Sequence, residues 1–163
     1  MVITEVERIL DQHDRAMNGD AWHGDPVWKI LEAITVEQAA RRACANTHTI
    51  WELVAHMMFW ETEVYRRLDD LQARSAKGLN FPATPSATEE NWNSTLAEFR
   101  RSNTDFRHSV SQLEPARLDQ TTSGRDKTIY VEVHGVIQHH LYHAGQIAIL
   151  SKFDGLNTGF AGL

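Results

Sequence analysis

The sequence predicts an all-α protein, a four-helix bundle with short extra helices. Apolar residues recur three and four positions apart along most of the chain, which is the period of an amphipathic helix. Thr or Ser followed three residues later by Glu or Gln recurs near the starts of these segments, as in a capping box. Four segments are long. Because neither half of the chain has enough apolar faces to close a core, we expect residues 1–163 to form one domain of the bundle type.

The first half of the chain predicts two long helices with shorter pieces between them. The first is expected at about residues 2–17, and the shorter pieces lie near 26–43. One capping box, Thr35 with Gln38, lies within these shorter pieces, and a second, Thr49 with Glu52, comes after them. The second box begins a long helix at about 50–69, in which these apolar residues keep helical spacing: Ile50, Leu53, Val54, Met57, Trp60, Val64 and Leu68.

The second half predicts two more long helices. A capping box at Ser86 and Glu89 indicates a helix at about 88–114, and the last helix is expected at about 128–152. Residues 68–88 are rich in Pro, Ser, Gly and Ala and have no period, so we expect a loop that crosses one end of the bundle.

Composition and charge narrow the class of protein. Of the residues, 42% are hydrophobic and 23% charged, as in ordinary globular domains. The formal net charge of -6 lacks the basic footprint that nucleic acid attracts, so we expect no nucleic-acid partner. The chain has one cysteine, no apolar run long enough to span a bilayer, and acidic residues among its first positions. We therefore expect a cytoplasmic protein that does not enter a membrane.

Histidines in the last predicted helix give the first chemical signal. The segment VIQHHLYHAGQI at 136–147 is otherwise mostly apolar, and an imidazole buried without a partner costs free energy. His139 and His143 are one helical turn apart, so both rings can converge on one point, and their HxxxH spacing is that of helical zinc ligands. His140 is also about one turn from His143 and is the alternative to His139.

His56 is the candidate for a third ligand. On a helical wheel it lies about 60° from Leu53, so its side chain points toward the core. A core histidine hydrogen-bonded to a backbone carbonyl is the alternative for His56 alone. For the whole group, the alternative is a patch of hydrogen-bonded histidines without a metal.

Three stretches resemble the DinB-like family of four-helix-bundle metalloproteins. TIWELVAHMMFWE at 49–61 and GVIQHHLYHAGQIAIL at 135–150 are close to the family's two motifs. GDAWHGDPVW at 19–28 is similar to the N-terminal signature of one branch of the family. The resemblance covers nearly the whole chain and implies the same bundle fold.

The resemblance also implies a ligand set and a chemistry. The metal ligands would be His56, His139 and His143, with His140 at a variable position. Three histidines leave a coordination position open, as in catalytic zinc sites. We expect one divalent ion, zinc or nickel, and thiol-dependent S-transferase or hydrolase chemistry on a small molecule, in a homodimer. The alternative is a non-catalytic binding or stress-response module in which the metal pins two helices together.

Further residues are candidates for the surroundings of the metal. His23, with Trp22, is expected at a pocket beside the open position, as a pocket residue or general base; an exposed loop histidine is the alternative. Trp60 lies one turn from His56 and either walls the pocket or fills the core. Gln146 lies one turn beyond His143 and either supports that ring or packs between helices.

Acids and the cysteine complete the candidates. A structural site would need a fourth ligand, and the acids near enough in sequence are Glu52, Glu61 and Glu132. Cys44 has only Arg41 and Arg42 nearby to stabilise a thiolate, so we expect a buried, unreactive side chain.

Overall fold

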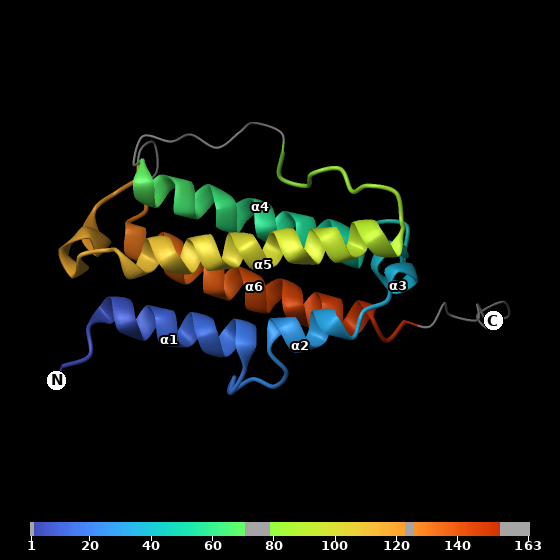
Figure 1. Cartoon of the computed structure of the whole chain (residues 1–163), viewed down its shortest axis with the longest axis horizontal. Helices are drawn as coiled ribbons and strands as arrows, with labels where there is room; N and C mark the ends of the chain where they lie inside the picture. The colour runs from blue at the N-terminus through green and yellow to red at the C-terminus, as the bar shows by residue number, and fades with distance from the viewer. Residues whose placement is uncertain (1, 71–78, 123–125, 154–163) are drawn as a thin grey trace, which may run out of the picture.

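Four long helices run side by side along the molecule (Figure 1). The computed structural model describes residues 2–70, 79–122 and 126–153, and these contain helices and one isolated antiparallel bridge, Thr121 with Thr128. The elements, in chain order, are α1 (Glu5–Asn18), α2 (Val27–Glu32), α3 (Val36–Ala40), α4 (Ile50–Asp69), α5 (Glu89–Ser111), the 3-10 helix η1 (Pro115–Asp119) and α6 (Ile129–Leu150). The predicted all-α bundle with short extra helices is confirmed.

Threonine side chains fix most helix starts. The predicted capping boxes of Thr35 with Gln38 and Thr49 with Glu52 are both present, at the starts of α3 and α4. A third box, Thr4 with Glu7, begins α1. In each, the hydroxyl accepts from the third amide of the helix and the longer side chain accepts from the threonine amide.

The capping box expected at Ser86 and Glu89 is wrong. Helix α5 begins at Glu89 itself, and Thr88 is its N-cap, with the hydroxyl accepting from the amide of Asn91. Ser86 instead accepts a hydrogen bond from the Asn91 side chain at 3.0 Å. The residue directly before the first helical turn has the geometry to cap it, and here that residue is Thr88.

Helix α6 occupies the centre of the bundle. It contacts α1, α2, α4 and η1. One apolar cluster surrounds its C-terminal half and includes Trp51, Phe99 and Ile147, and a second surrounds its N-terminal half. In the middle of α6, His140 and His143 are buried and His139 is half-buried, whereas Tyr142 on another side of the helix is exposed.

Cys44 does not lie in the core. Helix α3 ends at Ala40, and Cys44 is exposed in the turn that leads to α4, where its amide and carbonyl hydrogen-bond to the Thr47 hydroxyl. The prediction of a buried side chain is therefore wrong, because the helical period expected through residue 43 stops early.

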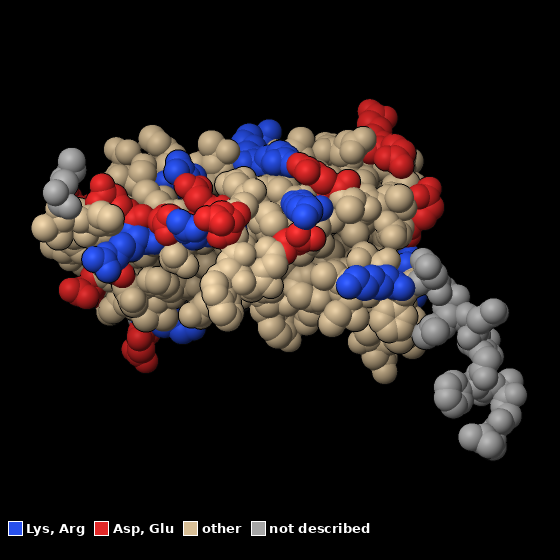
Figure 2. Space-filling view, turned by 90° about the horizontal axis from the view of Figure 1, so that it is seen from below, with Lys and Arg blue, Asp and Glu red and all other residues tan. Residues whose placement is uncertain are grey.

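Charges of both signs are interspersed on the face shown in Figure 2, where no continuous basic area forms. Several cations of the described residues are paired with acids, among them Arg15 with Asp11, Arg100 with Glu32, and Arg107 with Asp14. Within residues 2–70, 79–122 and 126–153, none of the helices has the combination of length and hydropathy needed to cross a bilayer.

Candidate metal centre

Three imidazoles converge between α4 and α6. His56 comes from α4, and His139 and His143 come from α6 one turn apart. The Nε2 atom of His139 lies 2.9 Å from Nε2 of His56 and 3.1 Å from Nε2 of His143. The structure therefore brings together the three residues selected from the sequence.

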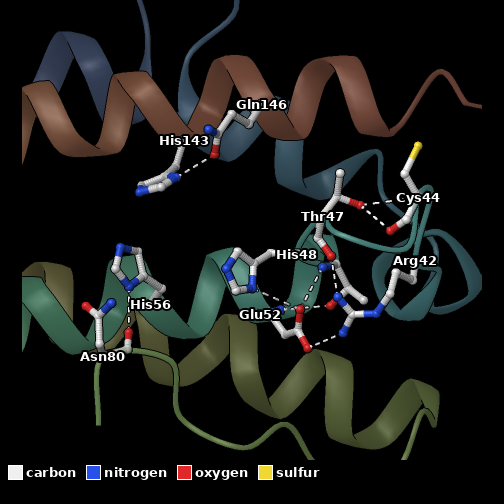
Figure 3. Close-up of polar contacts among 10 residues, drawn as sticks. Arg42, Cys44, Thr47, His48, Glu52, His56, Asn80, His143 and Gln146 are labelled. Carbon is white, nitrogen blue, oxygen red and sulfur yellow. Dashed lines mark hydrogen bonds and ion pairs between the residues drawn. The ribbon is translucent and has the colours of Figure 1, made fainter. Parts of the chain in front are cut away.

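The other ring nitrogens of two of these histidines are held by oxygens (Figure 3). His56 Nδ1 donates to the backbone carbonyl of Asn80 at 2.6 Å, and His143 Nδ1 lies 2.7 Å from Oε1 of Gln146. Because a carbonyl oxygen can only accept, each Nδ1 carries the proton. In a neutral ring the Nε2 atom then has a free lone pair, so His56 and His143 both aim lone pairs at His139.

Hydrogen bonds among the rings cannot satisfy this arrangement. A proton on Nε2 of His139 can be donated to only one of the two facing lone pairs, and its Nδ1 makes no hydrogen bond with the described residues. A divalent ion, in contrast, accepts one lone pair from each ring at once. The hydrogen bonds of His56 to Asn80 and of His143 to Gln146 would orient two of its ligands, as such outer contacts usually do for metal-bound histidines. The residues fit a metal ion.

Burial keeps these rings neutral. It lowers the pKa of His139 to about 4, with smaller contributions from the charges of His143 and His56. Burial is also the largest cause that lowers the pKa of His56 and of His143. Neutral imidazole is the form that ligates metals, so all three rings are in the ligating form at neutral pH.

Aromatic rings and a fourth histidine border the centre. The ring of Phe81 stacks on His56 at 4.2 Å between centroids, and His48 stacks on Phe81 at 3.7 Å. His48 Nδ1 lies 3.2 Å from Oε2 of Glu52 (Figure 3). His48 was not predicted from the sequence, because it lies before the N-cap of α4 and, eight positions from His56, about 80° around the helix direction. Phe81 was not predicted either, because it lies in a loop without a periodic pattern.

A groove of about 290 Å³ opens beside His139. It runs between α4 and α6, and its walls are mainly apolar with two cations and one acid: Trp60, Val64, Arg67, Lys127, Val131, Glu132, Gly135, Val136 and His139. Trp60 thus walls the pocket, one of its two expected roles, and its indole donates to Oδ1 of Asn80 at 2.7 Å.

Gln146 was expected either to support the ring of His143 or to pack between helices. Its contact with Nδ1 of His143 agrees with the first of these roles. None of the three acids considered as fourth ligands belongs to this group of histidines, although Glu132 lines the groove. Glu52 belongs to the cap of α4 and pairs with Arg42, Glu132 pairs with Arg67 at 3.2 Å, and Glu61 is buried beside other histidines. Among the described residues, the cluster of metal-type ligand atoms around His56 contains the three histidines alone.

The structure does not bring His23 to the three histidines. His23 is exposed in the loop before α2, and Trp22 beside it is fully exposed. His23 lines a different groove, together with Leu141, Ala144 and Ala148 of α6. These residues lie on the side of α6 turned away from His139, because two, five and nine positions along a helix rotate the side chain by about 200°, 140° and 180°. The pocket expected near this loop is instead the groove between α4 and α6.

His140, the alternative to His139, lies apart from the three-histidine group. It is fully buried and faces Glu61 and His13. One position along the helix turns the side chain by about 100°, which moves it from the groove to the bundle interior.

Fold and centre together define a four-helix bundle whose three-histidine group fits a metal ion. The chain matches the DinB superfamily over residues 21–147, and it belongs to that superfamily. The matched segment contains His56, His139 and His143, so the family resemblance seen in the motifs is confirmed. A search of the curated proteins found no match, and a search of the solved structures found none.

Proposed function

We propose that this protein is a metal-dependent enzyme that uses an open three-histidine centre for thiol transfer or hydrolysis. The observation that carries the proposal is the convergence of three neutral imidazoles without a fourth ligand from the described residues, at the edge of a groove. A site that only stabilised the fold would be expected to have a closed set of four protein ligands.

His56, His139 and His143 would hold the ion, and zinc or nickel suits a set of imidazole ligands. When bound, such an ion lowers the pKa of a thiol or a water molecule in the open position and so supplies a nucleophile at neutral pH.

The groove supports a small organic substrate that carries negative charge. Trp60, Val64 and Val136 offer apolar contacts, and Lys127 and Arg67 add positive charge at the same groove. Arg67 is paired with Glu132, so Lys127 is the cation that we assign to a substrate carboxylate. Low-molecular-weight thiols commonly carry such groups, and we favour thiol transfer over hydrolysis for this reason.

His48 is the side chain that we assign to proton transfer. The Glu52 carboxylate accepts from its Nδ1, which leaves Nε2 with a free lone pair in the neutral ring. His48 is close enough that its charge contributes, after burial, to lowering the pKa of His143. His48 does not line the groove beside His139, so it would take the proton that the nucleophile loses through an intervening water molecule.

The direct test is a thiol-conjugation screen with zinc-loaded and nickel-loaded protein. Each low-molecular-weight thiol is mixed with an electrophilic substrate, and loss of free thiol is followed over time. We expect turnover by the loaded protein and none by His139→Ala. The matched control is His108→Ala, an exposed histidine on α5, which keeps full activity. Equal turnover by His139→Ala and the wild type would contradict the proposal.

We also propose that the active form is a homodimer that acts on a small molecule. Light scattering coupled to size-exclusion chromatography measures the mass directly: twice 18.6 kDa supports the dimer, and 18.6 kDa contradicts it.

A further inference from the structure

A second cluster of polar side chains lies in the bundle core, apart from the centre described above. Each of the four long helices contributes one member: His13 from α1, Glu61 from α4, Asn103 from α5 and His140 from α6. The first, second and fourth are 0% exposed and Asn103 is 6% exposed.

The members face one another at short range. Glu61 Oε1 lies 3.8 Å from Nε2 of His13 and 4.0 Å from Nε2 of His140. The side-chain nitrogen of Asn103 lies 2.9 Å from the same Glu61 oxygen and 3.1 Å from Nε2 of His13. One ligand atom from each of His13, Glu61 and His140 lies within 4.8 Å of the others.

Several atoms of this cluster make no hydrogen bond with any residue that the structure describes. The atoms are Nδ1 of His13, Oε2 of Glu61, and both ring nitrogens of His140. Most buried polar atoms in folded proteins are hydrogen-bonded, and a group of exceptions in one place indicates an ion or water that completes them. The backbone carbonyl of Met57 opposes the lowering of the His140 pKa by burial, but no hydrogen bond joins it to either ring nitrogen.

The charge of Glu61 also needs compensation. A carboxylate without contact to water is strongly disfavoured. Among the ion pairs of the described residues, those of Glu61 involve only His13 and His140. Burial raises the pKa of the Glu61 carboxyl, so a bound proton is one form of compensation. One proton satisfies a single pair of atoms, however, and leaves other members of the cluster without partners.

We propose that His13, Glu61 and His140 hold a second divalent metal ion in the core of the bundle, with the side chain of Asn103 beside it. Two imidazoles and a carboxylate are a ligand set used for zinc, and bundle cores are a common place for such ions. The tetrahedral ligand atoms of zinc lie about 3.3 Å apart, so the side chains need to close by roughly half an ångström. Exchanging the positions of O and N in the Asn103 amide presents an oxygen to the ion as a fourth ligand. This site is independent of the proposed enzyme activity, because none of its ligands belongs to the three-histidine centre.

Metal stoichiometry tests the proposal. The whole chain is stripped with a chelator, reconstituted with excess Zn²⁺, desalted and measured by elemental analysis. We expect two equivalents of Zn²⁺ for the wild type. We expect one equivalent for His56→Ala, because this change leaves His13, Glu61 and His140 in place. Glu61→Gln keeps the shape of the side chain but removes its charge, and we expect it to lose one equivalent. The combination of His56→Ala with Glu61→Gln should bind none, and His108→Ala should keep two.

A wild type that binds one equivalent, with none in His56→Ala, would overturn the second site. So would full retention of two equivalents by Glu61→Gln. Thermal melting of each variant in the metal-free state shows that it is folded. If Glu61→Gln fails to fold, the wild type and His56→Ala still decide the question between two and one equivalents. Because these measurements do not use turnover, a failed activity screen leaves them interpretable.

Discussion

Nε2 of His56 and Nε2 of His139 lie 2.9 Å apart although 83 positions separate the residues in the chain. His139 can donate a proton on its Nε2 to His56 or to His143 but not to both, since each of those two rings carries its own proton on Nδ1. The pair is therefore an arrangement of lone pairs that a cation completes.

The first prediction concerns the ligands. His56→Ala, His139→Ala and His143→Ala should each lose one equivalent of Zn²⁺, because two remaining imidazoles bind the ion far more weakly than three. Elemental analysis after desalting measures the loss, with His108→Ala as the control. Unchanged metal content in all three variants would show that these rings are a hydrogen-bonded patch.

The second prediction concerns the contact that orients His143. Gln146→Leu removes the oxygen that accepts from Nδ1, and loss of such an outer contact typically weakens metal binding about 10–100-fold. Gln146→Glu restores an acceptor and should recover the affinity. Competition with a chromophoric chelator gives the dissociation constants, and Gln138→Leu, an exposed glutamine on the same helix, is the matched control. If both leucine variants bind equally well, Gln146 only packs between helices.

The third prediction separates metal binding from folding. The two helices that carry the ligands belong to extensive apolar clusters, so the chelated protein should keep its far-UV helicity. Its melting temperature should fall, since an ion that binds only the folded state stabilises it, by about 2.7 kcal/mol at a free concentration of 100 times Kd. Circular dichroism measures both quantities. Loss of helicity on chelation would instead indicate a structural metal.

The fourth prediction is a pH dependence of the metal-free protein. Burial lowers the pKa of His139 to about 4 in the folded chain, whereas the pKa of an unfolded histidine is about 6.5. Between these values the unfolded chain binds more protons, so stability is present above the unfolded pKa and is lost as pH falls toward the folded pKa. Urea midpoints in the presence of chelator should decrease from pH 7 to pH 4 with a steeper slope than in His139→Leu. Parallel curves would contradict the shift.

Local sequence signals predicted most of the fold. The box of Thr49 and Glu52 placed the start of α4 at the residue observed, because a cap depends only on side chains within one turn. The same rule failed at Ser86, where Thr88 stood closer to the first turn. Cys44 was misplaced because the helical period of the preceding segment does not reveal where the backbone turns away.

Prediction of the centre succeeded where ligands share a helix and failed where the chain reaches the site by a loop. Spacing within α6 favoured His139 and His143 and left His140 as the alternative to His139, and the family resemblance placed His140 at a variable position. Asn80 acts through its backbone carbonyl, so its residue type carries no signal. His23 was assigned to the pocket on loop position alone, and the path of a loop depends on contacts that local patterns do not encode.

The core cluster did have a detectable signal. His13 lies one turn from both Ile9 and Met17, on the buried face of α1, and a histidine on such a face requires a partner. The partners are on other helices, however, and spacing within one helix cannot identify them.

The open three-histidine centre can be seen in an anomalous difference map from crystals of the zinc-loaded protein, collected at the zinc absorption edge. We expect a peak about 2.0–2.1 Å from Nε2 of His56, His139 and His143, with the remaining position facing the groove beside Trp60. A map without a peak among these three nitrogens, or with a protein carboxylate closing the fourth position, would contradict an open three-histidine centre.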